Sequence, residues 1–143
     1  MDILEITFDE IERSNLKNII SMISHFNAES IELSSSNENI EYILNETNHE
    51  NGAIYFKLNN ANVFDVTLKE FFINLIVYKR EIEINMDFNC NDMFKIDLNI
   101  IKKAIIEWNK IILAKNYYCG YEPATDRCTQ FFSNIHTGPL KWS

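Results

Sequence analysis

The most regular pattern in the sequence is EIEINMDF, at residues 81–88. Apolar side chains occupy every second position, and the positions between them are polar and include Glu81, Glu83 and Asp87. Successive side chains of a β-strand point to opposite faces, so this alternation predicts a strand with one apolar face and one acidic face. We expect the acidic face to point outward.

Other short segments fit strands of the same sheet. The predicted strands are Ile3–Phe8, Ser30–Ser34, Ile40–Asn45 and Ala53–Leu58. The segment 40–45 is ambiguous, because its apolar residues would also suit one or two turns of helix. A second ambiguous segment is 68–78. Its apolar spacing and the preceding Thr67–Glu70 capping box favour a helix, although 71–77 is apolar enough to be a buried strand.

Two further helices are predicted from apolar residues at helical spacing. The first carries an apolar stripe over 16–26 and begins either at Thr7, whose capping box contains Glu10, or later at Ser14. The second begins at the N-cap Asp97 and continues to about residue 115, with lysines near its C-terminal end.

The last segment, 116–143, differs in composition from the rest of the chain. It contains both prolines, two of the three glycines and many aromatic residues. We expect an irregular aromatic C-terminal arm that is ordered by packing against the sheet or the helices. The 143 residues suit one domain. The predicted fold is a single α+β domain over 1–143, with a small, mainly antiparallel sheet and about three helices.

The charge of the chain indicates the kind of partner. There are 21 acidic and 13 basic residues, and the net charge is -8. Nucleic-acid binding requires basic residues, so a nucleic acid is not expected as a ligand, whereas a basic protein is. No lysine or arginine occurs between Lys17 and Lys57, a stretch with many glutamates. The predicted partner-binding residues are acidic or aromatic: Glu38, Glu41, Glu46, Glu50, Glu81, Glu83, Asp87, Tyr121 and Trp142.

The sequence gives no sign of catalysis. It has no glycine-rich phosphate loop, no nucleophile elbow and no zinc-binding helix motif, so we predict no catalytic, cofactor-binding or metal-binding residue. One alternative is a small hydrolase that uses Cys119 or Cys128 with His136 and Asp126. The simpler interpretation is that both cysteines are small buried residues.

The chain has features of a cytoplasmic protein. Its three cysteines cannot all pair within one chain, which suits a reducing compartment. The N-terminus lacks the basic and apolar regions of a signal peptide. No apolar run approaches the roughly 20 residues that a membrane span needs. We therefore expect a cytoplasmic protein that does not enter membranes.

The C-terminal arm contains phrases typical of a known group of proteins. They are CGYEPATD at 119–126, TQFF at 129–132 and GPL at 138–140. This arm resembles the C-terminus of bacterial polymorphic-toxin immunity proteins, such as those of contact-dependent growth inhibition systems. The resemblance implies a small cytosolic protein that binds a toxin domain delivered by a neighbouring cell. Such proteins share no catalytic motif, so no functional residue carries over.

Together these features predict an immunity protein rather than an enzyme. It would bind a cognate toxin domain, a basic nuclease, as a monomer in a 1:1 complex. An acidic and aromatic surface would occlude the toxin's active site. The cysteine hydrolase is one alternative, and an inhibitor that mimics nucleic acid is another.

Overall fold

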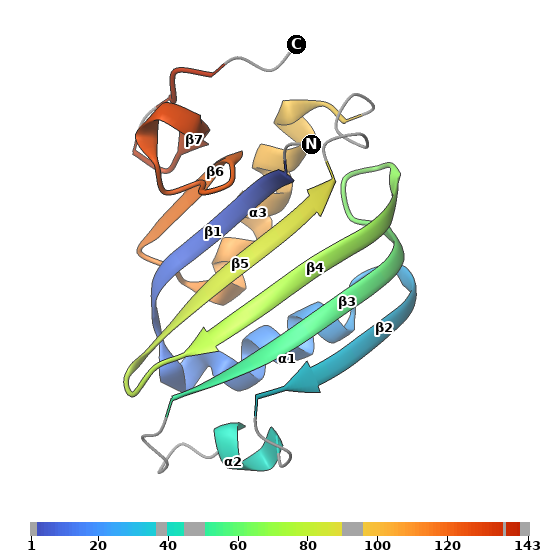
Figure 1. Ribbon diagram of the computed structural model, residues 1–143, viewed down its shortest axis with the longest axis vertical. Coiled ribbons are helices and arrows are strands. Elements are labelled where there is room, and N and C mark those ends of the chain that lie inside the picture. The colour runs from blue at the N-terminus through green and yellow to red at the C-terminus, as the bar shows by residue number, and fades with distance from the viewer. Residues whose placement is uncertain (1–2, 37–39, 45–50, 90–95, 136, 141–143) are drawn as a thin grey trace.

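The computed structural model describes residues 3–36, 40–44, 51–89, 96–135 and 137–140. These residues form a seven-stranded antiparallel sheet in the order β2-β3-β4-β5-β1-β6-β7 (Figure 1). The strands are β1 (Ile3–Glu12), β2 (Ala28–Ser35), β3 (Gly52–Asn62), β4 (Thr67–Val77), β5 (Glu81–Asn89), β6 (Asn116–Tyr121) and β7 (Gln130–Ser133).

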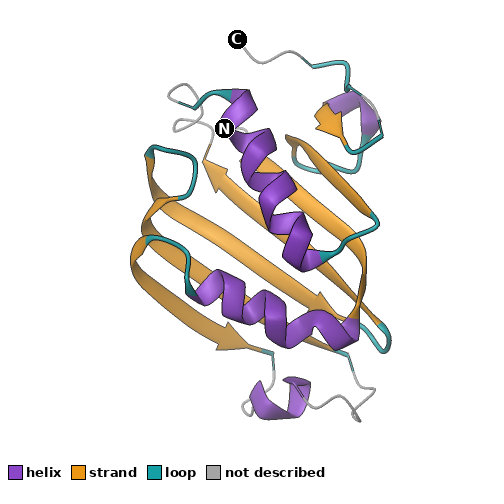
Figure 2. Ribbon diagram, turned by 180° about the vertical axis from the view of Figure 1, so that it is seen from behind, coloured by secondary structure: helices purple, strands orange, loops and turns teal. Residues whose placement is uncertain are grey.

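Two helices, α1 (Leu16–Ser24) and α3 (Leu98–Ile112), pack on the same face of the sheet (Figure 2). A third helix, α2 (Ile40–Leu44), is only five residues long and lies at one end of the sheet (Figure 1). The predicted α+β class with an antiparallel sheet is therefore confirmed. No helix in the described ranges is long and apolar enough to cross a membrane.

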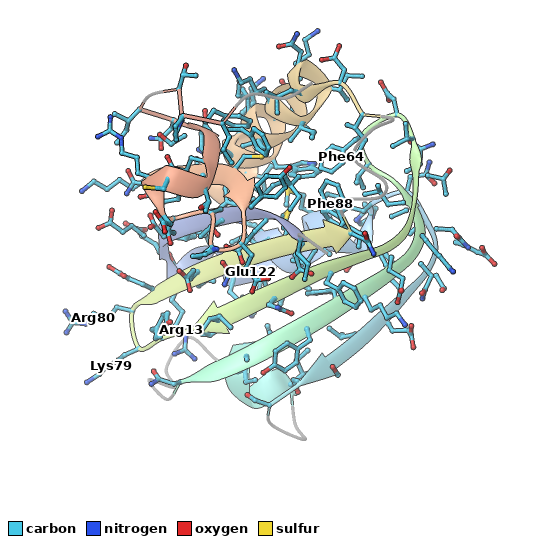
Figure 3. All side chains as sticks on the ribbon, turned by 45° about the horizontal axis from the view of Figure 1, so that its top comes forward. Arg13, Phe64, Lys79, Arg80, Phe88 and Glu122 are labelled. Carbon is cyan, nitrogen blue, oxygen red and sulfur yellow. The ribbon has the colours of Figure 1, made fainter. Side chains whose placement is uncertain are left out.

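The core lies between the sheet and the two longer helices. The apolar residues of 81–88 are all buried, which confirms the strand predicted from their alternation. Five aromatic rings meet at the centre of this layer: Phe26, Phe64, Phe71, Phe88 and Trp108. Their centroids lie 5.0–5.9 Å from their neighbours, the usual range for packed aromatic pairs. Figure 3 shows Phe64 and Phe88 side by side in this cluster.

Of the two predicted starts for the first helix, Ser14 lies closer to the observed start than Thr7 does. α1 begins at Leu16, because β1 continues to Glu12 through an irregularity between Phe8 and Ile11. Glu10 lies there with a positive φ of 51°. Thr7 is a strand residue and caps no helix.

Two predictions of secondary structure are wrong. The segment 68–78, predicted as a helix, is strand β4, so the third long helix does not exist. The pairing of β4 with both β3 and β5 makes it a central strand, and the burial of such strands produces the near-continuous apolar run seen here. Conversely, 40–45 was predicted as a strand, and residues 40–44 form α2.

The helix predicted from Asp97 is confirmed. The Asp97 carboxylate accepts a hydrogen bond from the Asn99 amide at 2.8 Å, as an N-cap does. The helix ends where Leu113 adopts the left-handed conformation, with a φ of 57°. There the Asn109 side chain accepts a hydrogen bond from the Ala114 amide at 2.9 Å and closes the turn.

The C-terminal arm is more regular than predicted. It contributes β6 and β7 to the sheet, so the expectation of an irregular segment is wrong for these residues. The expectation that the arm packs on the rest of the molecule is confirmed, because Phe131 and Phe132 are buried in the core. Both strands are short and carry no clean alternation, which hid them from sequence analysis.

Candidate partner-binding surface

The sheet face opposite to α1 and α3, which we call the open face, is covered by no described helix (Figures 1 and 2). The strand residues that face it are those that alternate with the core residues. Its acidic members are Glu5, Asp9, Glu12, Glu32, Glu70, Glu81, Glu83 and Asp87. The bases that the described strands place on or beside this face are Lys57 and Lys69. The open face is therefore acidic.

Carboxylates are placed directly opposite one another on this face. In the register of β1 with β5, Glu5 pairs with Asp87 and Glu12 pairs with Glu81. Like charges at directly opposed positions of neighbouring strands destabilise a sheet. Two such pairs, one toward each end of the β1–β5 ladder, place opposed negative charges along these adjacent strands of the open face.

Lys57 is engaged by other carboxylates. Its ammonium group lies 3.1 Å from a Glu70 carboxylate oxygen on β4 and 3.9 Å from a Glu32 carboxylate oxygen on β2. Lys79 and Arg80 lie in the turn between β4 and β5, at one end of the sheet (Figure 3). The acidic pair of Glu5 and Asp87 lies toward the other end of β5.

Asp87 shows the electrostatic effect of this crowding most clearly. Burial, together with the negative charges of Glu122 and Glu5, raises the pKa of its carboxyl group from 3.8 to about 6. Glu122 follows β6 and lies beside β1 and β5 (Figure 3). Carboxylates whose pKa is raised by burial and like charges are typical of functional sites.

Glu5 is held in place by its neighbours. The Ala124 amide donates a hydrogen bond to Glu5 Oε1 at 2.9 Å, and Thr7 Oγ1 lies 3.2 Å from the same oxygen. Thr7 Oγ1 also lies 3.0 Å from Asn85 Oδ1, so the hydroxyl is shared between the two acceptors. The Glu5 carboxylate is thus fixed beside Asp87 and cannot turn away from it.

A hollow of about 380 Å³ borders this cluster. Asp87, Glu70 and Lys69 line it together with the half-buried apolar ring of Phe72. Two carboxylates beside such a ring suit a long basic side chain, because its aliphatic part packs on the ring while its charge meets the carboxylates.

The predicted partner-binding residues fall into three groups. Glu81, Glu83 and Asp87 lie on the open face. Tyr121 points toward the core side, where its ring packs on Phe131 with 5.2 Å between centroids. The others are not placed: Glu38, Glu46, Glu50 and Trp142 lie outside the described residues, and Glu41 lies in α2 with its side chain undescribed.

The acidic residues of β1 and β4 were not among the partner-binding residues predicted from the sequence. The signal for β1 was available, because Glu5, Thr7 and Asp9 alternate with apolar residues in the same way as 81–88 does. The predicted helix over 68–78 hid Glu70, since a helix would have placed it on a different face.

The structure gives no support to a cysteine nucleophile. Cys119 is buried, and burial raises the pKa of its thiol far above neutral pH, which keeps it protonated and unreactive. The Asp126 carboxylate is occupied in accepting a hydrogen bond from the Cys128 amide at 3.0 Å. His136 lies outside the described residues, which contain no group of three or more histidines, cysteines or acids able to hold a metal ion.

The fold is similar to that of a chain in the crystal structure of the toxic C-terminal tip of CdiA from Pseudomonas aeruginosa in complex with immune protein. The two chains are 21% identical, the match covers 98% of this chain and 99% of the other, and the TM-score is 0.71. No curated protein matches the chain. The family model of the PABL017 Cdi1I immunity protein matches residues 2–137, so the chain belongs to this immunity protein family.

Proposed function

We propose that the protein neutralises its cognate toxin domain by covering a basic surface of that domain with the open face. Membership of an immunity protein family makes it a toxin inhibitor rather than an enzyme. The observation that carries the choice of surface is the opposition in register of two pairs of acids, Glu5 with Asp87 and Glu12 with Glu81, on the sheet face that no described helix covers.

The energetics of the free protein support this choice. Directly opposed like charges cost the sheet roughly 0.2–1 kcal/mol per pair, and a half-buried Asp87 adds a desolvation cost. A solvated acidic surface would ordinarily mix its charges with bases. Lysine or arginine side chains from a partner would remove the repulsion on binding. The partner surface is therefore basic in this proposal.

The proposed toxin is a nuclease. An enzyme that holds nucleic acid presents lysines and arginines to the phosphates, and a rigid row of carboxylates competes for the same groups. The inhibitor would then occlude the active site as a monomer in a 1:1 complex, in the cytoplasm where the toxin acts. A chain of similar fold occurs in the crystal structure of a CdiA toxic tip in complex with immune protein, and this supports the proposed complex.

The test of the surface is a charge reversal with a matched control. Glu83→Lys changes the centre of the open face, whereas Glu107→Lys makes the same change on α3, in the layer on the other side of the sheet. Glu107 pairs with Lys110 at 2.7 Å in an exposed position, where such pairs contribute little to stability. Association of each variant with the toxin domain encoded beside its gene is measured over a range of salt concentrations.

The two variants should behave differently. We expect Glu83→Lys to slow association about tenfold or more at low salt and to weaken its salt dependence, while Glu107→Lys stays within about twofold of the unmodified protein. Equal association rates for both variants would exclude the open face as the binding surface.

A competition experiment tests the proposed nuclease. Transfer RNA or plasmid DNA should compete with the immunity protein for the toxin domain, because both would occupy the same basic surface. A toxin domain that binds transfer RNA, plasmid DNA and the immunity protein at the same time would contradict occlusion of the active site.

A further inference from the structure

The two edges of the sheet differ in how they are covered. At the β7 edge, residues 137–140 cover the outer side: the Gly138 amide donates to the Phe131 carbonyl, the Leu140 amide donates to the Gln130 carbonyl, both at 3.0 Å, and Phe132 forms a bridge with Thr137. At the other edge, β2 pairs with β3, and no described segment pairs with its outer side. Figure 1 shows β2 as the last strand of the sheet.

β2 lacks the lysine and proline that often prevent an edge strand from pairing with another chain. The charged residues of its sequence, AESIELSS, are Glu29 and Glu32. From Ser30 to Ser35 its residues pair with β3 in an unbroken register, whereas Asn60 of β3, between the partners of Ala28 and Ser30, has a positive φ of 49°. Soluble proteins normally blunt an edge of this length with lysine, proline or a bulge, since a regular free edge is a template for a further strand.

The backbone groups available at this edge follow from the ladder with β3. The Ser36 amide donates to the Ala53 carbonyl at 2.9 Å, which places the hydrogen-bonded pairs of the ladder at even-numbered residues of β2. The backbone N–H and C=O groups of Ile31 and Leu33 therefore point to the outer edge. A new strand would pair with these two residues.

The side chains of β2 indicate the chemistry of such a strand. Leu33, which points to the helix side of the sheet opposite Phe56, is 50% exposed. Glu32 points to the open face, and its side chain is 64% exposed. It lies in the same cross-sheet row as Asp87, so a strand beside β2 would lie next to the acidic open face.

We propose that an extended segment of the cognate toxin domain adds to the sheet as a strand along the outer edge of β2. Its side chains alternate, with apolar ones beside Leu33 and lysine or arginine beside Glu32. Backbone hydrogen bonds supply affinity in this mode of recognition, and the alternate side chains supply specificity. This inference rests on the proposed function, because it names a part of the toxin that the immunity protein binds.

The test uses a proline substitution to remove one backbone N–H from the outer edge of β2. Leu33→Pro deletes an N–H that the ladder with β3 does not use, and proline is tolerated at such positions of edge strands. The matched control, Leu33→Val, keeps both the N–H and an apolar side chain. We expect Leu33→Pro to weaken binding of the toxin domain about tenfold or more and Leu33→Val to change it less than about threefold.

Amide hydrogen exchange of the unmodified protein gives a second measurement, which holds even if the proline variant fails to fold. The amides of Ile31 and Leu33 should exchange more slowly in the toxin complex than in the free protein. The proposal is overturned if neither amide gains protection in the complex. It is also overturned if a folded Leu33→Pro variant binds the toxin domain with unchanged affinity.

The remaining outcomes separate this inference from the proposed function. If Glu83→Lys weakens binding and Leu33→Pro does not, the open face binds the toxin and the β2 edge does not. If neither variant changes binding, the proposed function itself fails. A dimer of the free protein that Leu33→Pro dissociates would overturn the toxin segment as occupant in favour of a second copy of this chain.

Discussion

Replacing Asp87 with asparagine should stabilise the free protein and weaken its complex with the toxin. The substitution keeps the shape of the side chain and removes the charge that faces Glu5 across the β1–β5 ladder. Since burial and the charges of Glu122 and Glu5 disfavour the ionised form, the native state improves when that form is absent. In the complex, the same charge would be balanced by a basic partner.

The size of the effect follows from the pKa of Asp87. A pKa of about 6, compared with 3.8 for the free group, corresponds to about 3 kcal/mol against the ionised state at neutral pH. Asp87 is only half-buried, and solvent screening reduces this to roughly 1–2 kcal/mol. In a protein of this size we expect the Asp87→Asn variant to melt about 3–8 °C higher at pH 7.5.

The pH dependence gives the sign of the effect. Because the native pKa lies above the unfolded one, the contribution of Asp87 is most favourable below about pH 4 and is lost as the pH rises through about 6. The advantage of Asp87→Asn should therefore be large at pH 7.5 and much smaller at pH 4.5.

Urea titrations at both pH values measure the free energy of unfolding of each variant. Glu107→Gln serves as the control, because it removes a carboxylate from an exposed position on α3, away from the acidic pairs of the open face. An Asp87→Asn variant that is no more stable than the unmodified protein at pH 7.5, or that gains equally at both pH values, would refute the reasoning.

Three further predictions concern other parts of the molecule. Arg13→Met should lower the free energy of unfolding by about 2–4 kcal/mol in urea titrations, because the buried guanidinium donates to the carbonyls of Tyr78 at 3.0 Å and Ile43 at 3.1 Å. Gly120→Ala should cost about 1–3 kcal/mol in the same assay and loosen β7, since a Cβ there would lie 2.2 Å from the Thr129 carbonyl oxygen. In native protein at pH 7.5, iodoacetamide should modify the exposed Cys128 much faster than the buried Cys119, and fast modification of Cys119 would reopen the hydrolase alternative.

The predictions from sequence succeeded where one physical pattern dominated. The alternation at 81–88 marks a strand with one buried face, and the apolar stripe with an aspartate cap marks α3. Both segments are long enough for their periodicity to be unambiguous. The acidic members of the open face on β5 were found for the same reason.

Predictions from the sequence were wrong or missing where contacts between distant parts of the chain determine the structure. β4 pairs on both sides, and its open face carries Phe72 and Ile76 as well as polar residues, so its apolar run is nearly continuous and also fits a helix. The opposition of Glu5 with Asp87 depends on the register of two strands that are far apart in the chain, and no local signal encodes it. The open β2 edge could not be predicted either, because strand order is a property of the whole fold.

Because side chains alternate along each strand, every second residue lies in the core and the residues between them lie on the outer surface. On β5, Ile82, Ile84 and Met86 build the buried core, whereas Glu83 and Asp87 lie on the outer surface. Changing a residue of the second set leaves the buried layer intact. In the proposed mode of binding, point substitutions at every second position of the central strands would change the toxin specificity while the buried layer keeps the protein folded.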